Sequence, residues 1–184
     1  MNNFFSNYYF KIFEKLNEVD PNDINKIIKL LIKVNNKKNK IFLFGNGASA
    51  SIASHVSVDM TKILKFRSYN FNEANLITCF SNDYGYENWI SNTIDAYSKT
   101  GDLVILISSS GKSKNIINAG KLSNKKKLNL ITFTGFLKDN PLKKLGKINI
   151  WINSKNYNII ETTHQTILLS IIDYIYSKKL KKVL

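Results

Sequence analysis

The spacing of hydrophobic and polar positions along the chain changes near residue 39. Before it, the apolar residues have helical spacing. Residues 4–18 form an aromatic, amphipathic stretch, and Pro21 marks the start of a second one. The apolar stripe of this second stretch consists of Ile24, Ile27, Ile28, Leu31 and Val34. We therefore expect two N-terminal helices whose apolar sides cover the sheet or another subunit.

After residue 39, short apolar runs alternate with helical patterns. Strands are predicted at 40–45, 74–80, 102–109, 128–135 and 147–153, and helices at 48–64, 88–98, 112–126 and 157–180. This alternation predicts an α/β fold with a five-stranded parallel sheet, doubly wound and flanked by helices. The expected organisation is a single domain over 1–184, with a helical segment at 1–38 and an α/β core at 39–184.

Composition narrows the class of protein further. The 184 residues are 43% hydrophobic, which is enough to build a core. No apolar run reaches the ~18 residues that span a bilayer, and the N-terminus lacks the basic and apolar regions of a signal peptide. Cys79 is the single cysteine, so no internal disulfide can form. We expect a cytoplasmic protein with no membrane partner.

The formal net charge of +14 raises the question of a nucleic-acid partner. The positive excess is lysine spread over helix faces, and Arg67 is the single arginine. Because base recognition favours the bidentate guanidinium group of arginine, we interpret these lysines as solvated surface and expect no nucleic acid to bind. The positive field would still attract a small anionic substrate.

Two glycine- and serine-rich stretches follow predicted strands, and in doubly wound sheets such positions bind ligands. The first, "GNGASA" at 45–50, matches a relaxed dinucleotide motif, but no acidic residue stands at the expected ~20-residue distance, since Asp83 lies too far along. The second contains "GKS" at 111–113, but Leu106 occupies the position where a P-loop needs glycine. We therefore expect no nucleotide cofactor.

The second stretch is better explained as a cradle for an anion. Hydroxyl groups surround Gly111 where a strand leads into a helix, and backbone N–H groups at a helix N-terminus attract negative charge. Capping the helix would need only one serine. The four serines, Ser108, Ser109, Ser110 and Ser113, favour a phosphate site.

Several motifs together resemble a known family. "ISSSGKSKNII" looks like the signature of the sugar-isomerase (SIS) domain. "GNGASASIASHVSVDM", "CFSNDYGYENWIS" and "ETTHQTILLSIIDYI" resemble the phosphoheptose isomerases, which interconvert sedoheptulose 7-phosphate and glycero-manno-heptose 7-phosphate. The resemblance covers nearly the whole chain and implies an aldose–ketose isomerase of sugar phosphates. Two alternatives are an isomerase of another sugar phosphate and a non-catalytic SIS domain that binds a sugar phosphate.

The resemblance implies roles for individual residues. The four serines match the phosphate loop of the family, and Asn46 and Ser49, with Gly47 between them, match its sugar-facing first loop. Asp83 matches an aspartate of the substrate site. His55 matches a metal-binding histidine, and Asp59 stands where the family has a glutamate that serves as metal ligand and catalytic base. Members of the family are typically homotetramers whose N-terminal helices help to form the core of the assembly.

The final helix departs from the family. The family has a glutamine and, eight residues later, a histidine on the metal, but here these positions are Glu161 and Leu169, and no histidine follows His164. His55 and Asp59 share a helical face, and so do Glu161 and His164. These four residues would suit zinc, with Asp59, Glu161, His164 and Asp83 as the candidate catalytic groups. A metal-free acid–base isomerase is the alternative.

Overall fold

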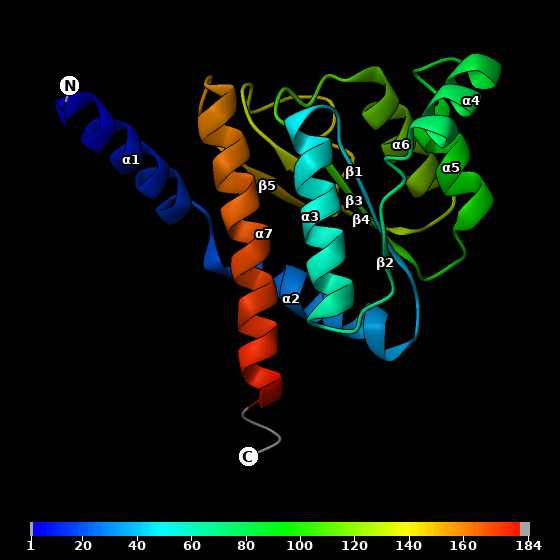
Figure 1. The fold of residues 1–184 in the computed structure, drawn as a ribbon, viewed down its shortest axis with the longest axis horizontal. Coiled ribbons are helices and arrows are strands. Elements are labelled where there is room, and N and C mark those ends of the chain that lie inside the picture. Colours follow the sequence, from blue (N-terminus) through cyan, green and yellow to red (C-terminus); the bar gives the residue numbers. More distant parts are fainter. Residues whose placement is uncertain (1, 181–184) are drawn as a thin grey trace.

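The computed structural model describes residues 2–180 and has seven helices and five strands in this part of the chain (Figure 1). Their order is α1 (Asn2–Asn17), α2 (Pro21–Asn36), β1 (Ile41–Phe44), α3 (Ala48–Lys62), β2 (Ser68–Tyr69), α4 (Ala74–Tyr84), α5 (Trp89–Tyr97), β3 (Leu103–Ser108), α6 (Lys114–Lys125), β4 (Asn129–Thr134), β5 (Ile148–Trp151) and α7 (Tyr157–Leu180).

The five strands form one parallel sheet in the order β2-β1-β3-β4-β5. Helices α2, α3 and α7 cover one face, and α5 and α6, with α4 beyond them, cover the other (Figure 1). The doubly wound fold predicted from the sequence is therefore confirmed.

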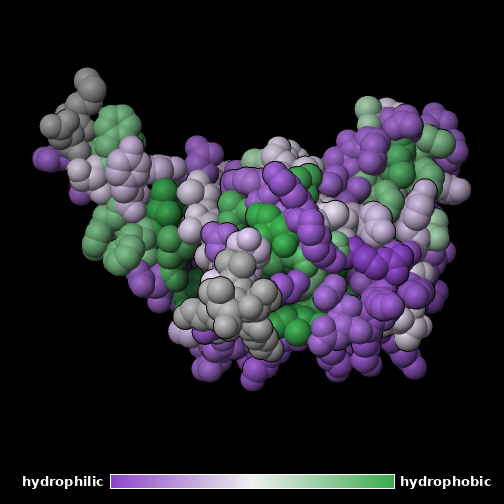
Figure 2. Space-filling model, turned by 60° about the horizontal axis from the view of Figure 1, so that its bottom comes forward, coloured by the Kyte–Doolittle hydropathy of each residue, from purple (hydrophilic) through white to green (hydrophobic). Residues whose placement is uncertain are grey.

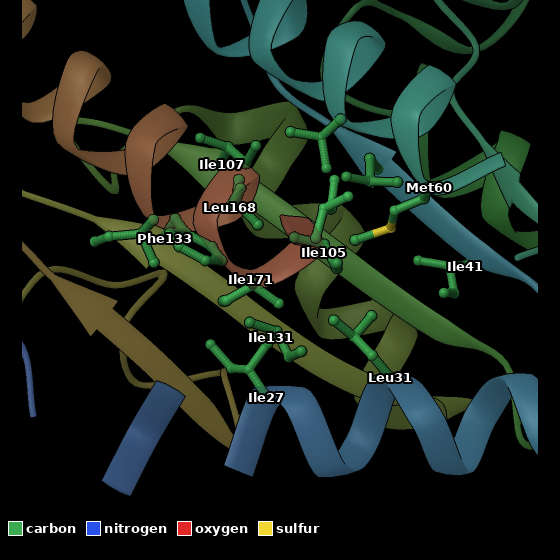
Figure 3. Close-up of a cluster of buried hydrophobic side chains, with 14 of the residues drawn as sticks. Ile27, Leu31, Ile41, Met60, Ile105, Ile107, Ile131, Phe133, Leu168 and Ile171 are labelled. Carbon is green, nitrogen blue, oxygen red and sulfur yellow. The ribbon is translucent and has the colours of Figure 1, made fainter. Parts of the chain in front are cut away.

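The central strand β3 explains why the sheet needs both layers of helices. Its residues point alternately to the two faces, as in any β-strand, and all six are buried. Leu103, Ile105 and Ile107 belong to the core under α2, α3 and α7, part of which Figure 3 shows. Val104 and Leu106 belong to the core under α5 and α6. A strand that is buried on both faces reads as a continuous apolar run, which made it easy to predict.

One predicted strand is wrong. Residues 74–80 lie in helix α4, and the edge strand β2 is the short segment Ser68–Tyr69. Leu76, Ile77 and Phe80 have the spacing of one helical face and pack, partly buried, on the α5–α6 core. A short apolar run fits either a strand or a helix, and here the edge of the sheet is already occupied when the chain reaches Ala74. The remaining predicted elements match to within about two residues at each end.

The two N-terminal helices have different surroundings. The stripe Ile27, Ile28, Leu31 and Val34 of α2 is buried against the chain's own sheet. Helix α1 extends away from the body (Figure 1), and hydrophobic side chains lie along this projection (Figure 2). Its exposed aromatic residues are Phe4, Phe5, Tyr9, Phe10 and Phe13. Of the helices in the described range, none is long and apolar enough to cross a membrane.

Candidate active site

Two loops meet at the carboxyl edge of the sheet, between β1 and β3. These strands are neighbours, yet the chain leaves β1 toward β2 on one side and leaves β3 toward β4 on the other. Such a reversal opens a crevice outside the strand ends, where ligands of doubly wound proteins bind. The first loop runs from β1 into α3 at 45–47, and the second runs from β3 into α6 at 109–113.

Glycines allow both turns. Gly47 has φ +53° and Gly111 has φ +63°, in the left-handed region that side chains with a Cβ rarely occupy. At Gly111 there is also no space, because an added Cβ would lie 2.0 Å from Oδ1 of Asn140. The sequence therefore brings the backbone of the second loop into direct contact with the loop after β4.

The predicted serine cradle surrounds one cavity of about 140 Å³. It is lined by Asn46, Ser49, Ile107, Ser108, Ser109, Ser110, Ser113, Tyr157 and Glu161. Ser113 stands at the N-cap of α6, but its side chain makes no capping hydrogen bond, and its Oγ lies 3.4 Å from Oγ of Ser108. Capping thus does not explain these serines, whose hydroxyl groups face a cavity at a helix N-terminus. Gly47 does not line the cavity and acts through the backbone turn.

Glu161 brings a carboxylate to the cradle from the first turns of α7. The Ser109 hydroxyl donates a hydrogen bond to Oε1 of Glu161 at 3.2 Å. Glu161 also lines a second cavity of about 400 Å³, together with His55 and Gln165. A single carboxylate therefore borders both the serine cradle and the neighbouring space between α3 and α7.

His55 and Asp59 form a pair on α3. Nε2 of His55 lies 3.3 Å from Oδ2 of Asp59, and 49% of the His55 side chain is exposed. On the other side of the ring, Nε2 of Gln165 lies 3.3 Å from Nδ1 of His55. The imidazole ring therefore lies between the Gln165 amide and the Asp59 carboxylate, with one ring nitrogen toward each. Gln165 was not predicted, although it follows Glu161 by four residues on the same helical face.

The comparisons with known proteins agree on a family. A family model for the SIS domain matches residues 4–135. The chain is 33% identical to a probable phosphoheptose isomerase of Thermoplasma acidophilum, over 79% of this chain and 85% of that relative. It is 31% identical to the phosphoheptose isomerase of Buchnera aphidicola subsp. Schizaphis graminum, over 91% and 88% of the two chains.

The chain belongs to the phosphoheptose isomerase family of SIS-domain proteins. Its fold also matches the structure of phosphoheptose isomerase GmhA from Neisseria gonorrhoeae, with a TM-score of 0.88 at 21% identity, over 96% of this chain and 98% of that one. The family inferred from the sequence motifs is thus confirmed.

His164 does not lie where the sequence predicted a metal ligand and a catalytic group. It is fully buried and lines neither cavity. Its Nε2–H donates to the backbone oxygen of Thr134 at 3.1 Å, and its ring meets the Phe133 ring edge-on. Three residues along a helix turn a side chain by 300°, so Glu161 and His164 point about 60° apart. That difference places one at the sheet edge and the other against the sheet.

The predicted zinc set is consequently not assembled. In the range 2–180, no group of three or more histidine, cysteine, aspartate or glutamate side chains is placed to hold a metal ion. His55 and Asp59 form a pair, Glu161 is bonded to Ser109, and His164 is buried elsewhere. A zinc site needs about four ligands, so the donors of one chain do not fit it.

The buried ring of His164 makes stability depend on pH. Burial lowers the pKa of His164 to about 4, although the Thr134 carbonyl opposes this shift. Between pH 6.5 and 4 the unfolded chain binds a proton that the folded chain does not, so stability is full above pH 6.5 and falls below it. We expect a loss of roughly 3 kcal/mol in the free energy of unfolding.

Urea titrations between pH 6.5 and 4 test this dependence. The free energy of unfolding should fall less steeply with decreasing pH in His164→Gln than in the unmodified protein. Equal slopes would contradict the assignment.

Asp83 also lies apart from the predicted substrate site. It stands exposed near the end of α4, where the Asn82 amide donates to its Oδ1 at 3.0 Å, and it does not line the cradle. The prediction placed it after a strand, and because the segment is a helix, its carboxylate is carried to the outside of α4. Within a single chain, the structure therefore does not bring Asp83 to the serines.

Ser110 offers the most direct test of the cradle. Its Oγ accepts a hydrogen bond from the backbone N–H of Lys112 at 3.2 Å, so its hydroxyl proton can donate to a ligand. We expect Ser110→Ala to weaken binding of inorganic phosphate by about 1–2 kcal/mol in calorimetry. Ser177→Ala, on the exposed end of α7, is the matched control and should bind as the unmodified protein does. Unchanged affinity of Ser110→Ala would place the phosphate elsewhere.

Proposed function

We propose that this protein is a sugar-phosphate aldose–ketose isomerase that acts on sedoheptulose 7-phosphate. The curated relatives are named phosphoheptose isomerases. The observation that carries the proposal for this chain is the position of Glu161, which borders both the serine cradle and the adjoining cavity. A carboxylate at that boundary stands next to the place where a bound phosphate leads into the sugar chain.

The sizes of the two cavities support this arrangement. Binding sites for small molecules usually measure about 300–1,000 Å³, and the cradle, at about 140 Å³, is too small for a whole sugar phosphate. It suits the phosphate group, which would accept hydrogen bonds from the serine hydroxyls and from N–H groups of the first turn of α6. The neighbouring cavity of about 400 Å³ offers space for the sugar.

The residues at the boundary can perform the proton transfers. Isomerisation removes a proton from the carbon beside the carbonyl group, forms an enediol, and returns a proton to the former carbonyl carbon. We assign the proton transfer between the carbon atoms to Glu161. Its carboxylate accepts the proton from the first carbon and then donates a proton to the neighbouring carbon. The hydroxyl proton moves in the same direction, from the oxygen on the carbon that loses its proton to the former carbonyl oxygen. We assign this transfer to His55, which lines the same cavity as Glu161 and is paired with Asp59.

We also propose that the protein is a cytoplasmic homo-oligomer, and that it is a homotetramer, as the resemblance to the family implies. The exposed aromatic side of α1 supports an assembly, as does an apolar cavity of about 570 Å³ where the end of α1 meets α2 and α7. Monomers rarely expose apolar patches of this kind. The exposed free thiol of Cys79 is compatible with a reducing compartment.

Incubation with sedoheptulose 7-phosphate, followed by NMR, tests the proposed function. We expect the signal of an aldose phosphate to appear and to reach an equilibrium with the ketose. If the protein turns over only a different sugar phosphate, it is still an isomerase but its substrate is not sedoheptulose 7-phosphate. Saturable binding without turnover would support a sugar-phosphate sensor, an alternative favoured by Leu169 and by the burial of His164.

A further inference from the structure

Three side chains from separate parts of the chain meet beside the serine cradle. Asn46 follows β1, Asn115 stands in the first turn of α6, and Tyr86 belongs to the connection between α4 and α5. The two asparagines exchange hydrogen bonds, each amide nitrogen donating to the other's Oδ1 at 2.9 Å. The Tyr86 hydroxyl donates to Oδ1 of Asn46 at 3.1 Å.

Asn115 has only one allowed orientation in this group. Its Oδ1 also accepts the backbone N–H of Ile116 at 3.0 Å, and the side chain is buried. Rotating the amide by 180° would place its NH₂ group against that N–H, donor against donor. The backbone thus sets the orientation of Asn115, and Asn115 in turn sets that of Asn46.

The remaining hydrogen-bonding capacity of Asn46 follows from counting. Its Oδ1 has two lone pairs, and both are used, by Asn115 and by Tyr86. Its Nδ2 has two protons, and one is used by Asn115. Since Asn46 lines the cradle, what it can still offer to a ligand is one N–H donor.

We infer that Asn115 and Tyr86 are positioning residues that hold Asn46 with an N–H donor toward the substrate. This inference rests on the proposed function. An N–H in this place stabilises negative charge on a sugar oxygen, as develops when the carbonyl group becomes an enediolate. A carbonyl oxygen in the same place would repel that charge. The arrangement therefore selects a ligand with an oxygen acceptor, and not an amino group, beside the cradle.

Tyr86→Phe tests the role of the hydroxyl with little risk to folding, because 55% of Tyr86 is exposed. We expect kcat for sedoheptulose 7-phosphate to fall about two- to tenfold, the range for one hydrogen bond, while the Kd of inorganic phosphate stays unchanged. Tyr84→Phe is the matched control, a tyrosine of similar exposure in the same segment. Unchanged kcat in Tyr86→Phe, or equal losses in both variants, would overturn the inference.

A second measurement does not depend on turnover. In ¹⁵N-labelled protein, the side-chain amide signals of Asn46 can be identified by their loss in Asn46→Ala. Adding sedoheptulose 7-phosphate should shift one Nδ2–H signal of the unmodified protein, and the shift should shrink in Tyr86→Phe. If these shifts are seen but the protein does not turn over the substrate, the proposed isomerase activity is contradicted and the positioning of Asn46 is supported. No shift in the unmodified protein would overturn the inference, whether or not turnover occurs.

Discussion

Glu161→Gln is expected to lower kcat by about 10²–10⁴-fold, because an amide cannot accept the proton that the carboxylate removes from carbon. The amide oxygen can still accept the Ser109 hydroxyl, so the cradle should keep its shape. Glutamine is also the residue that the sequence resemblance places at this position in the family. The variant is therefore expected to fold normally and to bind inorganic phosphate with an affinity within about twofold of the unmodified protein.

The control for this variant is Glu73→Gln, an exposed glutamate at the start of α4 that makes no capping hydrogen bond. It should leave kcat unchanged. Full activity in Glu161→Gln would show that another group takes the proton. Asp59→Asn would then decide whether the base is the carboxylate beside His55.

The second large effect concerns assembly. Light scattering of the unmodified protein at micromolar concentration should give a multiple of the 21.1 kDa chain mass, with four chains as the proposed number. Phe10 and Phe13 lie on the projecting helix, 59% and 60% exposed. Replacing both by lysine places two charges in an apolar contact, a change that is costly unless the charges are paired, so the mass should fall toward that of one chain.

Leu137→Lys is a suitable control, since this exposed leucine lies in the connection after β4 and is not part of α1. It should leave the mass unchanged. Circular dichroism should show that the double variant keeps its helices. A single-chain mass for the unmodified protein would contradict the proposed oligomer.

The central strands could be predicted because their environment is simple. β3 is buried on both faces, and its first five residues are all apolar, with the polar Ser108 only at its end. The edge strand β2 was harder to predict from the sequence. β2 has only Ser68 and Tyr69, one buried and one exposed, which is too short to show alternation. The apolar run at 74–80 was predicted as a strand instead, although its side chains make the contacts of a helix.

Some residues of the candidate site could likewise be predicted from the sequence, and others could not. The four serines and Gly111 are close in sequence and could be found together. Whether a side chain of α7 faces the cavity or the sheet depends on how that helix is rotated, so the sequence placed His164 beside Glu161 in error. The contacts of Asn46 with Asn115 and Tyr86 join positions 69 and 40 residues apart, for which no local spacing exists.

The isomerisation run in D₂O tests the central claim most directly. If Glu161 takes the proton from carbon and this proton exchanges with solvent before Glu161 donates one to the neighbouring carbon, the aldose phosphate formed from sedoheptulose 7-phosphate should carry deuterium at the carbon next to the carbonyl group, detected by NMR. Glu161→Gln should form product and deuterated ketose about 10²–10⁴-fold more slowly. Binding of the sugar phosphate with no product and no deuterium in any form would contradict the account.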